Sequence, residues 1–272
     1  MSENLLTDGI TELLGAELET TDTELYVVNP SHRTIEELVS VMSELESPPS
    51  VKLLAGERPL KDVMDDFIVA SRAANLVDAG TLTVRTTSAE PENSLLITEK
   101  EVVAIVTAGE HVAGLTTGDE EFVESARDRY AENWESADEY TLRTPPLTEV
   151  RSTLSADISE TTADDFDQVL ASLQTARGNG DGLDEVTISL LVAAKNGELL
   201  YDISKWGEDI GLASKATFSR TKTKLEDMGL IDTEKVPIDV GRPRLRLMLG
   251  DDRLQDAEAD QLANVAQSLL SN

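Results

Sequence analysis

The stretch Ala213–Gly229, ASKATFSRTKTKLEDMG, decides how we interpret the rest of the chain. Between Lys215 and Lys224 it carries four cations and no acid, although the whole chain of 272 residues has a formal charge of -30. A local concentration of positive charge in so acidic a protein needs a physical reason. Contact with a polyanion is the simplest one, because cationic side chains that face phosphates displace condensed counterions. An ordinary solvated basic helix is the alternative.

This stretch has the signals of a helix with one buried face. Gly211 can end the preceding segment, and Ser214 can cap the new helix. At about 100° per residue, Phe218, Thr221 and Leu225 fall on one side, which we expect to be buried. The rest of the helix surface carries small, polar and cationic side chains: Ala216, Thr217, Ser219, Arg220, Thr223 and Lys224. Such a surface suits a helix whose first turns enter the major groove of DNA.

The flanking segments predict a winged helix-turn-helix. Two helices are expected upstream, over 183–196 and 199–210, with a short turn through Gly211. Downstream, two strand-like segments at 231–236 and 244–249 flank a turn rich in Pro and Gly, which indicates a β-hairpin. Arginines alternate at period two along it and therefore share one face: Arg242, Arg244 and Arg246. A helix, a helix-turn-helix and a basic hairpin form this domain type.

Residues 183–250 resemble winged-helix transcription factors of the MarR and TrmB-like kind, through Ser219-Arg220, Leu225-Glu226 and the closing Gly229–Ile231. The run 199–249 is similar to a family of haloarchaeal transcriptional regulators related to TbsP, with DISKWGED, SKATFSRTK and DVGRPRLRL as landmarks. This likeness extends along most of the chain. It implies a sequence-specific regulator that binds double-stranded promoter DNA, and its TrmB-like aspect implies control of metabolic genes.

We expect two groups of DNA-binding residues. The recognition helix contributes Lys215, Thr217, Arg220, Thr223 and Lys224, and the wing contributes Arg242 and Arg244. Arg220 can pair with guanine or with phosphate, and the threonines can touch base edges. The wing arginines can reach phosphates or a narrow minor groove, although a basic edge that deters strand pairing is an alternative. The hypothesis requires that these cations face outward and are not matched one for one by carboxylates.

The amino-acid composition limits the kinds of protein that this chain can be. The chain has 53 acidic and 23 basic residues, spread along its length, which indicates a halophile's cytoplasm, where salt screens self-repulsion. An acidic mesophilic protein with interaction faces is the alternative. There are no cysteines and two isolated histidines, so we expect neither disulfides nor a metal site, and no cofactor. No apolar run approaches about 20 residues and no signal peptide is evident, so we expect a soluble cytoplasmic protein with no membrane contact.

The N-terminal part has the pattern of an α/β domain. After a first helix at 5–18, strand-like and helix-like segments alternate: 24–28, 34–45, 51–55, 60–79 and 81–85. This alternation predicts a parallel sheet core. Three short strands and a helix follow: 94–98, 101–107, 111–116 and 119–134. They predict an antiparallel extension. The expected fold class is therefore an α/β domain with a mixed sheet flanked by helices, followed by a winged helix-turn-helix domain.

This N-terminal domain resembles the phospholipase D-like sensor domain of TrmB-type regulators in element order and in its hairpin-then-helix ending. The catalytic phospholipase D pattern has a lysine two residues after a histidine, but Thr34 follows His32 and Ala113 follows His111 at that spacing. We therefore expect no phosphodiester chemistry. Neither a nucleophile–base pair nor a P-loop is evident, so an enzyme is not expected. The resemblance implies a sensing role.

The candidate ligand site is the turn NPSHR at 29–33, where the first long strand meets a helix. Open α/β sheets bind ligands at the carboxyl ends of their strands, and helix N-termini favour anions such as a phosphorylated metabolite. The candidate ligand-binding residues are Ser31, His32, Arg33, Arg58 and Arg85. The alternative is a simple turn with Ser31 as a helix cap.

We expect four segments, with Pro145-Pro146 as the main boundary. They are an α/β sensor or assembly domain at 1–145, a helical connector with a Gly-rich hinge at 146–182, the winged domain at 183–250 and an amphipathic helix at 251–272. That last helix can pack on its own domain or form a two-fold dimer, and operator symmetry favours a homodimer. The alternative function is an acidic interaction scaffold that uses the winged domain for protein contact.

Overall fold

The computed structural model describes residues 5–7, 9–21, 23–88, 93–109, 111–177, 183–237 and 243–270. The chain forms two compact units. The first comprises Met1–Asp65 and Arg72–Leu142, and the second comprises Asp66–Ser71 and Arg143–Asn272. Each unit has its own core, and each is therefore described separately.

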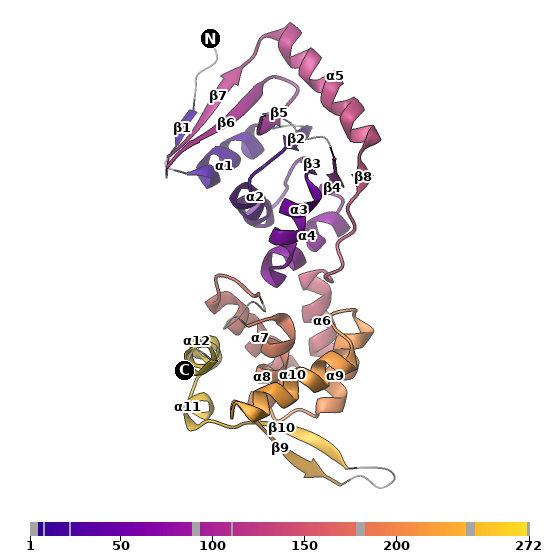
Figure 1. The fold of residues 1–272 in the computed structure, drawn as a ribbon, viewed down its shortest axis with the longest axis vertical. Helices are drawn as coiled ribbons and strands as arrows, with labels where there is room; N and C mark the ends of the chain where they lie inside the picture. The colour runs from indigo at the N-terminus through magenta and orange to yellow at the C-terminus, as the bar shows by residue number, and fades with distance from the viewer. Residues whose placement is uncertain are drawn as a thin grey trace. The chain divides into compact units, whose positions relative to one another are not determined.

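The first unit is built on a mixed sheet, which has eight strands among the described residues, in the order β1-β7-β6-β5-β2-β3-β4-β8 (Figure 1). Its centre is parallel and consists of β2 (Glu24–Val28), β3 (Ser50–Ala55) and β4 (Leu82–Thr86). The remaining strands pair antiparallel: β1 (Leu5–Thr7), β5 (Leu95–Ile97), β6 (Val102–Ala108), β7 (His111–Thr117) and β8 (Asp138–Glu139). The parallel core with an antiparallel extension, predicted from the alternating pattern, is confirmed.

Helices cover this sheet. They are α1 (Ile10–Thr20), α2 (His32–Glu44), α3 (Glu57–Met64), α4 (Phe67–Asp78) and α5 (Glu120–Ser136). α1 packs closely on β7, where a Cβ at Gly114 would lie 2.8 Å from a methyl group of Leu13. On α5, Val123 and Trp134 are buried in a cluster with side chains of the sheet. Trp134 meets the ring of Tyr26 edge to face, with 6.2 Å between the ring centroids, which fastens α5 to the sheet.

Two helices expected from periodicity are divided in the structure. The segment 5–18 begins with β1, whose Leu5 pairs with Gly114 of β7, and α1 starts only after Gly9. The segment 60–79 breaks at Asp65 and Asp66. The Asp66 carboxylate accepts a hydrogen bond from the Ile68 backbone N–H at 3.0 Å and so begins a new helix. Both breaks depend on partners that helical periodicity does not reveal.

The second unit contains α6 (Leu147–Asp157), α7 (Glu160–Ser172), α8 (Glu185–Lys195), α9 (Leu200–Asp209), α10 (Lys215–Asp227), β9 (Ile231–Val236), β10 (Arg244–Leu249), α11 (Asp252–Gln255) and α12 (Ala259–Leu270). One core joins them, and its largest members are Trp206, Phe166 and Phe218. The Trp206 indole N–H donates to Thr153 Oγ1 at 3.0 Å. The connector helices α6 and α7 therefore share the core of the winged domain. The predicted hinge at 178–182 lies outside the described residues.

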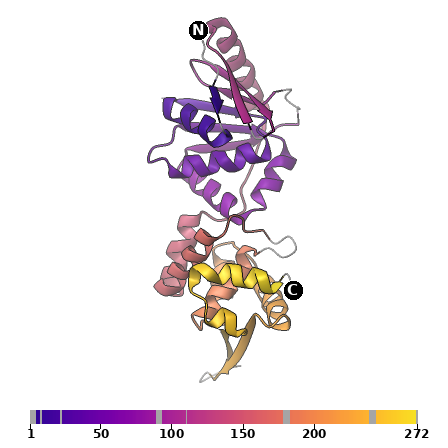
Figure 2. The same ribbon diagram turned by 90° about the vertical axis from the view of Figure 1, so that its left-hand side faces the viewer.

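The C-terminal segment forms two helices instead of the single helix expected. α11 ends at Gln255, and α12 begins at Ala259. The apolar stripe of α12 is fully buried at Leu262, Ala263 and Ala266, and α12 packs against α7 of the same chain (Figure 2). Packing on its own domain is thus the arrangement observed for this helix. Val265, Leu269 and Leu270 of the same stripe remain partly exposed, and the predicted dimer stays a prediction.

Candidate nucleic-acid interface

The second unit has the geometry of a winged helix-turn-helix. α8, α9 and α10 are followed by the antiparallel hairpin of β9 and β10, in which Arg244 pairs with Val236 and Leu249 with Ile231. A further pairing joins Leu199, just before α9, to β10 at Arg246. The wing is therefore a hairpin extended on one side by the segment between α8 and α9, a feature that the sequence pattern did not indicate.

Gly207 in α9 sets the approach of the two central helices. A Cβ at this position would lie 2.4 Å from the Phe218 ring of α10, so only glycine permits the observed packing. The turn that follows passes through Gly211 with φ of 75°, which is the left-handed region. The Leu212 N–H donates to the Gly207 carbonyl at 2.8 Å. These contacts direct α10 away from α9.

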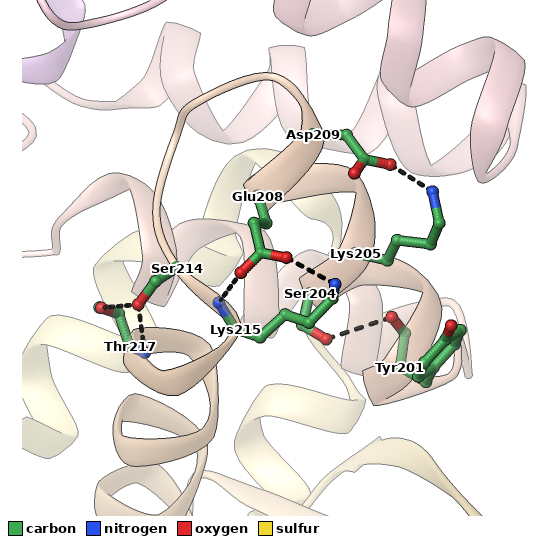
Figure 3. Close-up of polar contacts among 8 residues, drawn as sticks. All are labelled: Tyr201, Ser204, Lys205, Glu208, Asp209, Ser214, Lys215 and Thr217. Atoms are coloured by element: carbon green, nitrogen blue, oxygen red, sulfur yellow. Dashed lines mark hydrogen bonds and ion pairs between the residues drawn. The ribbon is translucent and has the colours of Figure 1, made fainter.

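The start of α10 is fastened to α9 by a polar network (Figure 3). Ser214 caps the helix by accepting from the Thr217 N–H at 3.1 Å. Lys215 donates from Nζ to one Glu208 oxygen at 2.5 Å, and its backbone N–H donates to the other at 3.3 Å. This hydrogen bond raises the pKa of the Lys215 amine and lowers the pKa of the Glu208 carboxyl. Lys215 therefore holds the two helices together.

The two sides of α10 agree with the helical periodicity, except that Thr221, expected on the buried side, is only half-buried. Phe218 and Leu225 are buried, and Arg220, Thr223 and Lys224 are exposed. The exposed face also includes Ala216 and Ser219. The Arg220 guanidinium lies 3.4 Å from Thr217 Oγ1, and the Thr223 hydroxyl donates to the Ser219 carbonyl at 3.0 Å. The face that points to solvent is thus small and polar, with two long cationic side chains.

Most cations of the winged region are paired with carboxylates. Among the described residues from 185 to 270, only three cations lack an ion pair, namely Arg220, Lys224 and Lys235. Lys222 pairs with Glu226 at 2.6 Å and is largely covered. Two of the four α10 cations therefore have carboxylate partners and two do not, so the cations are not matched one for one. Lys235 lies exposed in β9 and was not among the candidate residues, because only the arginines of the hairpin show a repeated spacing.

The wing arginines make contacts within the chain. Arg244 Nη1 lies 3.0 Å from Asp202 Oδ1, and its guanidinium stacks 4.5 Å from the centroid of the Tyr201 ring. Arg246 lies 3.8 Å from Glu234 across the hairpin. The predicted DNA contact Arg242 lies outside the described residues. Arg244 therefore links the wing to α9.

The predicted ligand residues of the first unit only partly converge. Ser31 caps α2 by accepting from the Thr34 N–H at 3.1 Å, as the simpler interpretation of this turn expects. His32 Nε2 lies 3.6 Å and Arg58 Nε 3.9 Å from the same Asp62 oxygen. The Asp62 carboxylate therefore lies beside His32 and Arg58, and its negative charge disfavours an anionic ligand next to these two side chains.

The other two predicted ligand residues differ in environment. Arg33 is exposed and has no ion pair among the described residues. Arg85 donates to the Trp134 carbonyl at 2.5 Å and stacks 4.9 Å from the Trp134 ring centroid. Arg85 therefore supports the attachment of α5. Within the described ranges, no group of three or more acidic or histidine side chains is arranged to hold a metal ion, and no helix is long and apolar enough to cross a membrane.

Comparison with known proteins gives two family matches. Residues 2–145 match the model described as "Transcriptional regulator TbsP-like, N-terminal", and residues 146–267 match "Transcriptional regulator TbsP-like, C-terminal HTH domain". No curated protein matches the sequence.

Two solved structures are similar in part. TrmBL2, an archaeal chromatin protein whose structure "shows a novel mode of DNA binding", is 16% identical over 51% of this chain and 54% of that chain, with a TM-score of 0.38. The chain thus spans about half the length of TrmBL2. Nuc from Salmonella typhimurium, a phospholipase D family member, is 14% identical over 51% of this chain and 99% of that chain, with a TM-score of 0.35.

Proposed function

The chain belongs to the family of TbsP-like transcriptional regulators, and from that premise we propose that α10 reads double-stranded promoter DNA through its exposed face. One observation carries the assignment. Arg220 and Lys224 lie on that face without a carboxylate partner among the described residues, in a chain of charge -30. A cation left unpaired where acids are abundant is available to phosphates and to base edges.

Within this proposal the α10 residues have different tasks. Arg220 contacts guanine or phosphate, and Thr223 and Lys224 contact the same groove. Thr217 supports Arg220 through its hydroxyl. We assign Lys215 mainly to the attachment of α10 to α9, because its amine donates a hydrogen bond to Glu208.

The wing contributes a second contact. We assign Arg242 and Lys235 to phosphates, and Arg244 to positioning the wing through Asp202. The acidic remainder of the chain repels DNA elsewhere, which orients the duplex toward α10. If the protein works at the high salt that its composition suggests, counterion release is a weak driving force, so direct contacts must supply the affinity.

The test is DNA binding by the double variant Arg220→Ala with Lys224→Ala, measured by fluorescence anisotropy on a promoter fragment selected by genome-wide mapping of bound sites. We expect affinity to fall by about 100-fold, since a specific base contact is worth about 1–3 kcal/mol. The slope of affinity against salt concentration should decrease by about one for each lost phosphate contact.

A matched control removes two positive charges elsewhere. Arg151→Ala with Arg253→Ala makes the same change in net charge, but these arginines are paired with Asp167 and Asp251. The control variant should bind DNA as the unchanged protein does. Full binding by the α10 variant, with its unfolding transition unaltered, would refute the assignment. Absence of DNA binding by the unchanged protein at any salt concentration, with retention of a protein partner, would instead support a scaffold.

Three further features belong to the proposal. A homodimer fits two-fold operators, and light scattering of the purified protein at several concentrations tests it. A haloarchaeal, cytoplasmic setting fits the acidic composition.

A sensing role for the first unit fits its pairing with a DNA-binding unit. The turn containing Ser31 and His32 is the weaker candidate for a phosphorylated metabolite, because Asp62 already holds His32 and Arg58.

A further inference from the structure

A groove of about 400 Å³ runs between α5 and the antiparallel part of the sheet in the first unit. Its floor is apolar because the strand register aligns three side chains. Leu95 of β5 pairs with Ala104 of β6, and Ala104 pairs with Leu115 of β7. Leu115 is 48% exposed, and Phe122 at the start of α5 is 54% exposed. A volume of this size is within the range of small-molecule sites.

The wall formed by α5 combines apolar and polar side chains. Phe122, Ala126 and Tyr130 follow one another at a spacing of four and face the groove, and Ser125 and Arg129 flank them on the same helix. The consecutive residues Arg129 and Tyr130 both line the groove, so its wall carries a guanidinium and a phenol. The remaining polar lining consists of Asn93 and Thr117.

Two of these side chains have no polar partner among the residues that the structure describes. Tyr130 is only 8% exposed and lines the groove, yet its hydroxyl makes no hydrogen bond to any residue that the structure describes. The hydroxyl oxygen itself is not buried, so it can donate to a ligand in the groove in place of water. Arg129 likewise has no ion pair within the described part of the chain. An acceptor that carries negative charge would satisfy both groups.

The neighbouring cavity shows why the charge of Arg129 is informative. That cavity, of about 580 Å³, lies along the other side of α5 and is lined by Glu120, Glu124 and Asp128 among others. There Arg127 lies 3.9 Å from Glu99, so its charge is balanced within the chain. Arg129, two residues further along the same helix, is exposed and has no carboxylate partner within the described part of the chain, so a ligand in the groove can pair with it.

We propose that the groove binds a small organic anion with an apolar body, such as an aromatic or branched carboxylate. The anionic head accepts from the Tyr130 hydroxyl and pairs with Arg129, and the apolar body lies on Leu95, Ala104 and Leu115 beside Phe122. The inference deepens the sensing role proposed for the first unit. Inorganic anions lack the apolar body and bind the groove poorly.

The test uses anilinonaphthalene sulfonate (ANS), an aromatic anion that fluoresces in apolar surroundings, and its uncharged analogue phenylnaphthylamine. We expect the full chain to bind one ANS per protomer. Arg129→Gln should weaken ANS binding by about tenfold or more, since a hydrogen bond to a charged group is worth about 1.5–3 kcal/mol. Phenylnaphthylamine binding should be unchanged by Arg129→Gln, and Tyr130→Phe should weaken ANS binding by several-fold.

Arg127→Gln is the matched control, since it makes the same chemical change on the same helix beside the other cavity. It should leave ANS affinity within about twofold. Benzoate should displace ANS, and inorganic phosphate at equal concentration should not. Equal effects of the two glutamine variants on ANS would overturn the proposal. So would ANS binding that falls as protein concentration rises, because a second copy of the chain would then cover the groove. No DNA is present, so failure here leaves the DNA-binding assignment untouched.

Discussion

The buried carboxylate of Glu17 offers a quantitative test of the packing between α1 and the sheet. Its side chain is 3% exposed, and Oε2 has no hydrogen-bond partner among the described residues. Burial, together with the charge of Glu101, raises the pKa of Glu17 to about 7 from 4.5. We predict that Glu17→Gln stabilises the first unit in a pH-dependent manner.

The sign of the effect follows from proton linkage. Below pH 4.5 Glu17 is protonated and uncharged in both the folded and the unfolded chain, so it does not lower the free energy of unfolding. Between pH 4.5 and about 7 the folded chain holds a proton that the unfolded chain has lost, and stability therefore decreases as pH rises. Above about pH 7 the full cost, about 3 kcal/mol, is present. Glu17→Gln should recover most of it at pH 8 and little at pH 4.5.

The assay is urea unfolding at several pH values, followed by the fluorescence of Trp134 in a Trp206→Phe background. The chain has two tryptophans, so this background leaves only the one in the first unit. Glu19→Gln on the same helix is the control, because Glu19 is exposed and the change in net charge is identical. An equal gain for Glu19→Gln would show that net charge is responsible. A gain for Glu17→Gln that does not vary with pH would refute the buried-charge explanation.

Three further substitutions, two in the second unit and one for comparison in the first, test helix packing by urea unfolding. Gly207→Ala should destabilise the second unit by at least about 1–3 kcal/mol and impair DNA binding, because the added methyl would meet the Phe218 ring. Gly15→Ala, in a helix with open space, should instead stabilise by about 0.5–1 kcal/mol, and the opposite ranking would contradict the packing argument. Asp66→Ala should cost the second unit about 1–3 kcal/mol, because the buried Ala176 N–H, which donates to the Asp66 carboxylate at 3.2 Å, would lose its acceptor. An Asp66→Ala variant with unchanged stability would show that this bond contributes little.

Helical and strand periodicity were enough to place the main elements. The division of α10 into a buried side with Phe218 and Leu225 and an exposed side with Arg220 and Thr223 follows from 3.6 residues per turn. The two strands of the hairpin also have the bounds expected from the sequence, 231–236 and 244–249, because strand residues and turn residues alternate there within a short segment. Each of these features depends on neighbours within a few residues, which a local pattern contains.

Contacts between distant segments were decided only by the tertiary structure. The sequence shows the cations Lys215 and Arg244, but not that Glu208 and Asp202 come within hydrogen-bonding distance of them. With 53 acids in the chain, proximity in sequence does not select a partner. Ion pairing requires the helices to be packed first, because the attraction between exposed charges falls steeply with distance and salt.

The groove beside α5 shows the same division. The stripe of Phe122, Ala126 and Tyr130 can be seen in the sequence as a helical face. Whether that face is covered depends on the register that brings Leu95 and Leu115 beside it. The sequence by itself determined most of the elements, the sign of the charge and the exposed face of α10, but not the breaks that divide the segments 5–18, 60–79 and 251–272. Tertiary packing decided which charges and hydroxyl groups stay unpaired, because pairing and burial are properties of segments that meet only after folding.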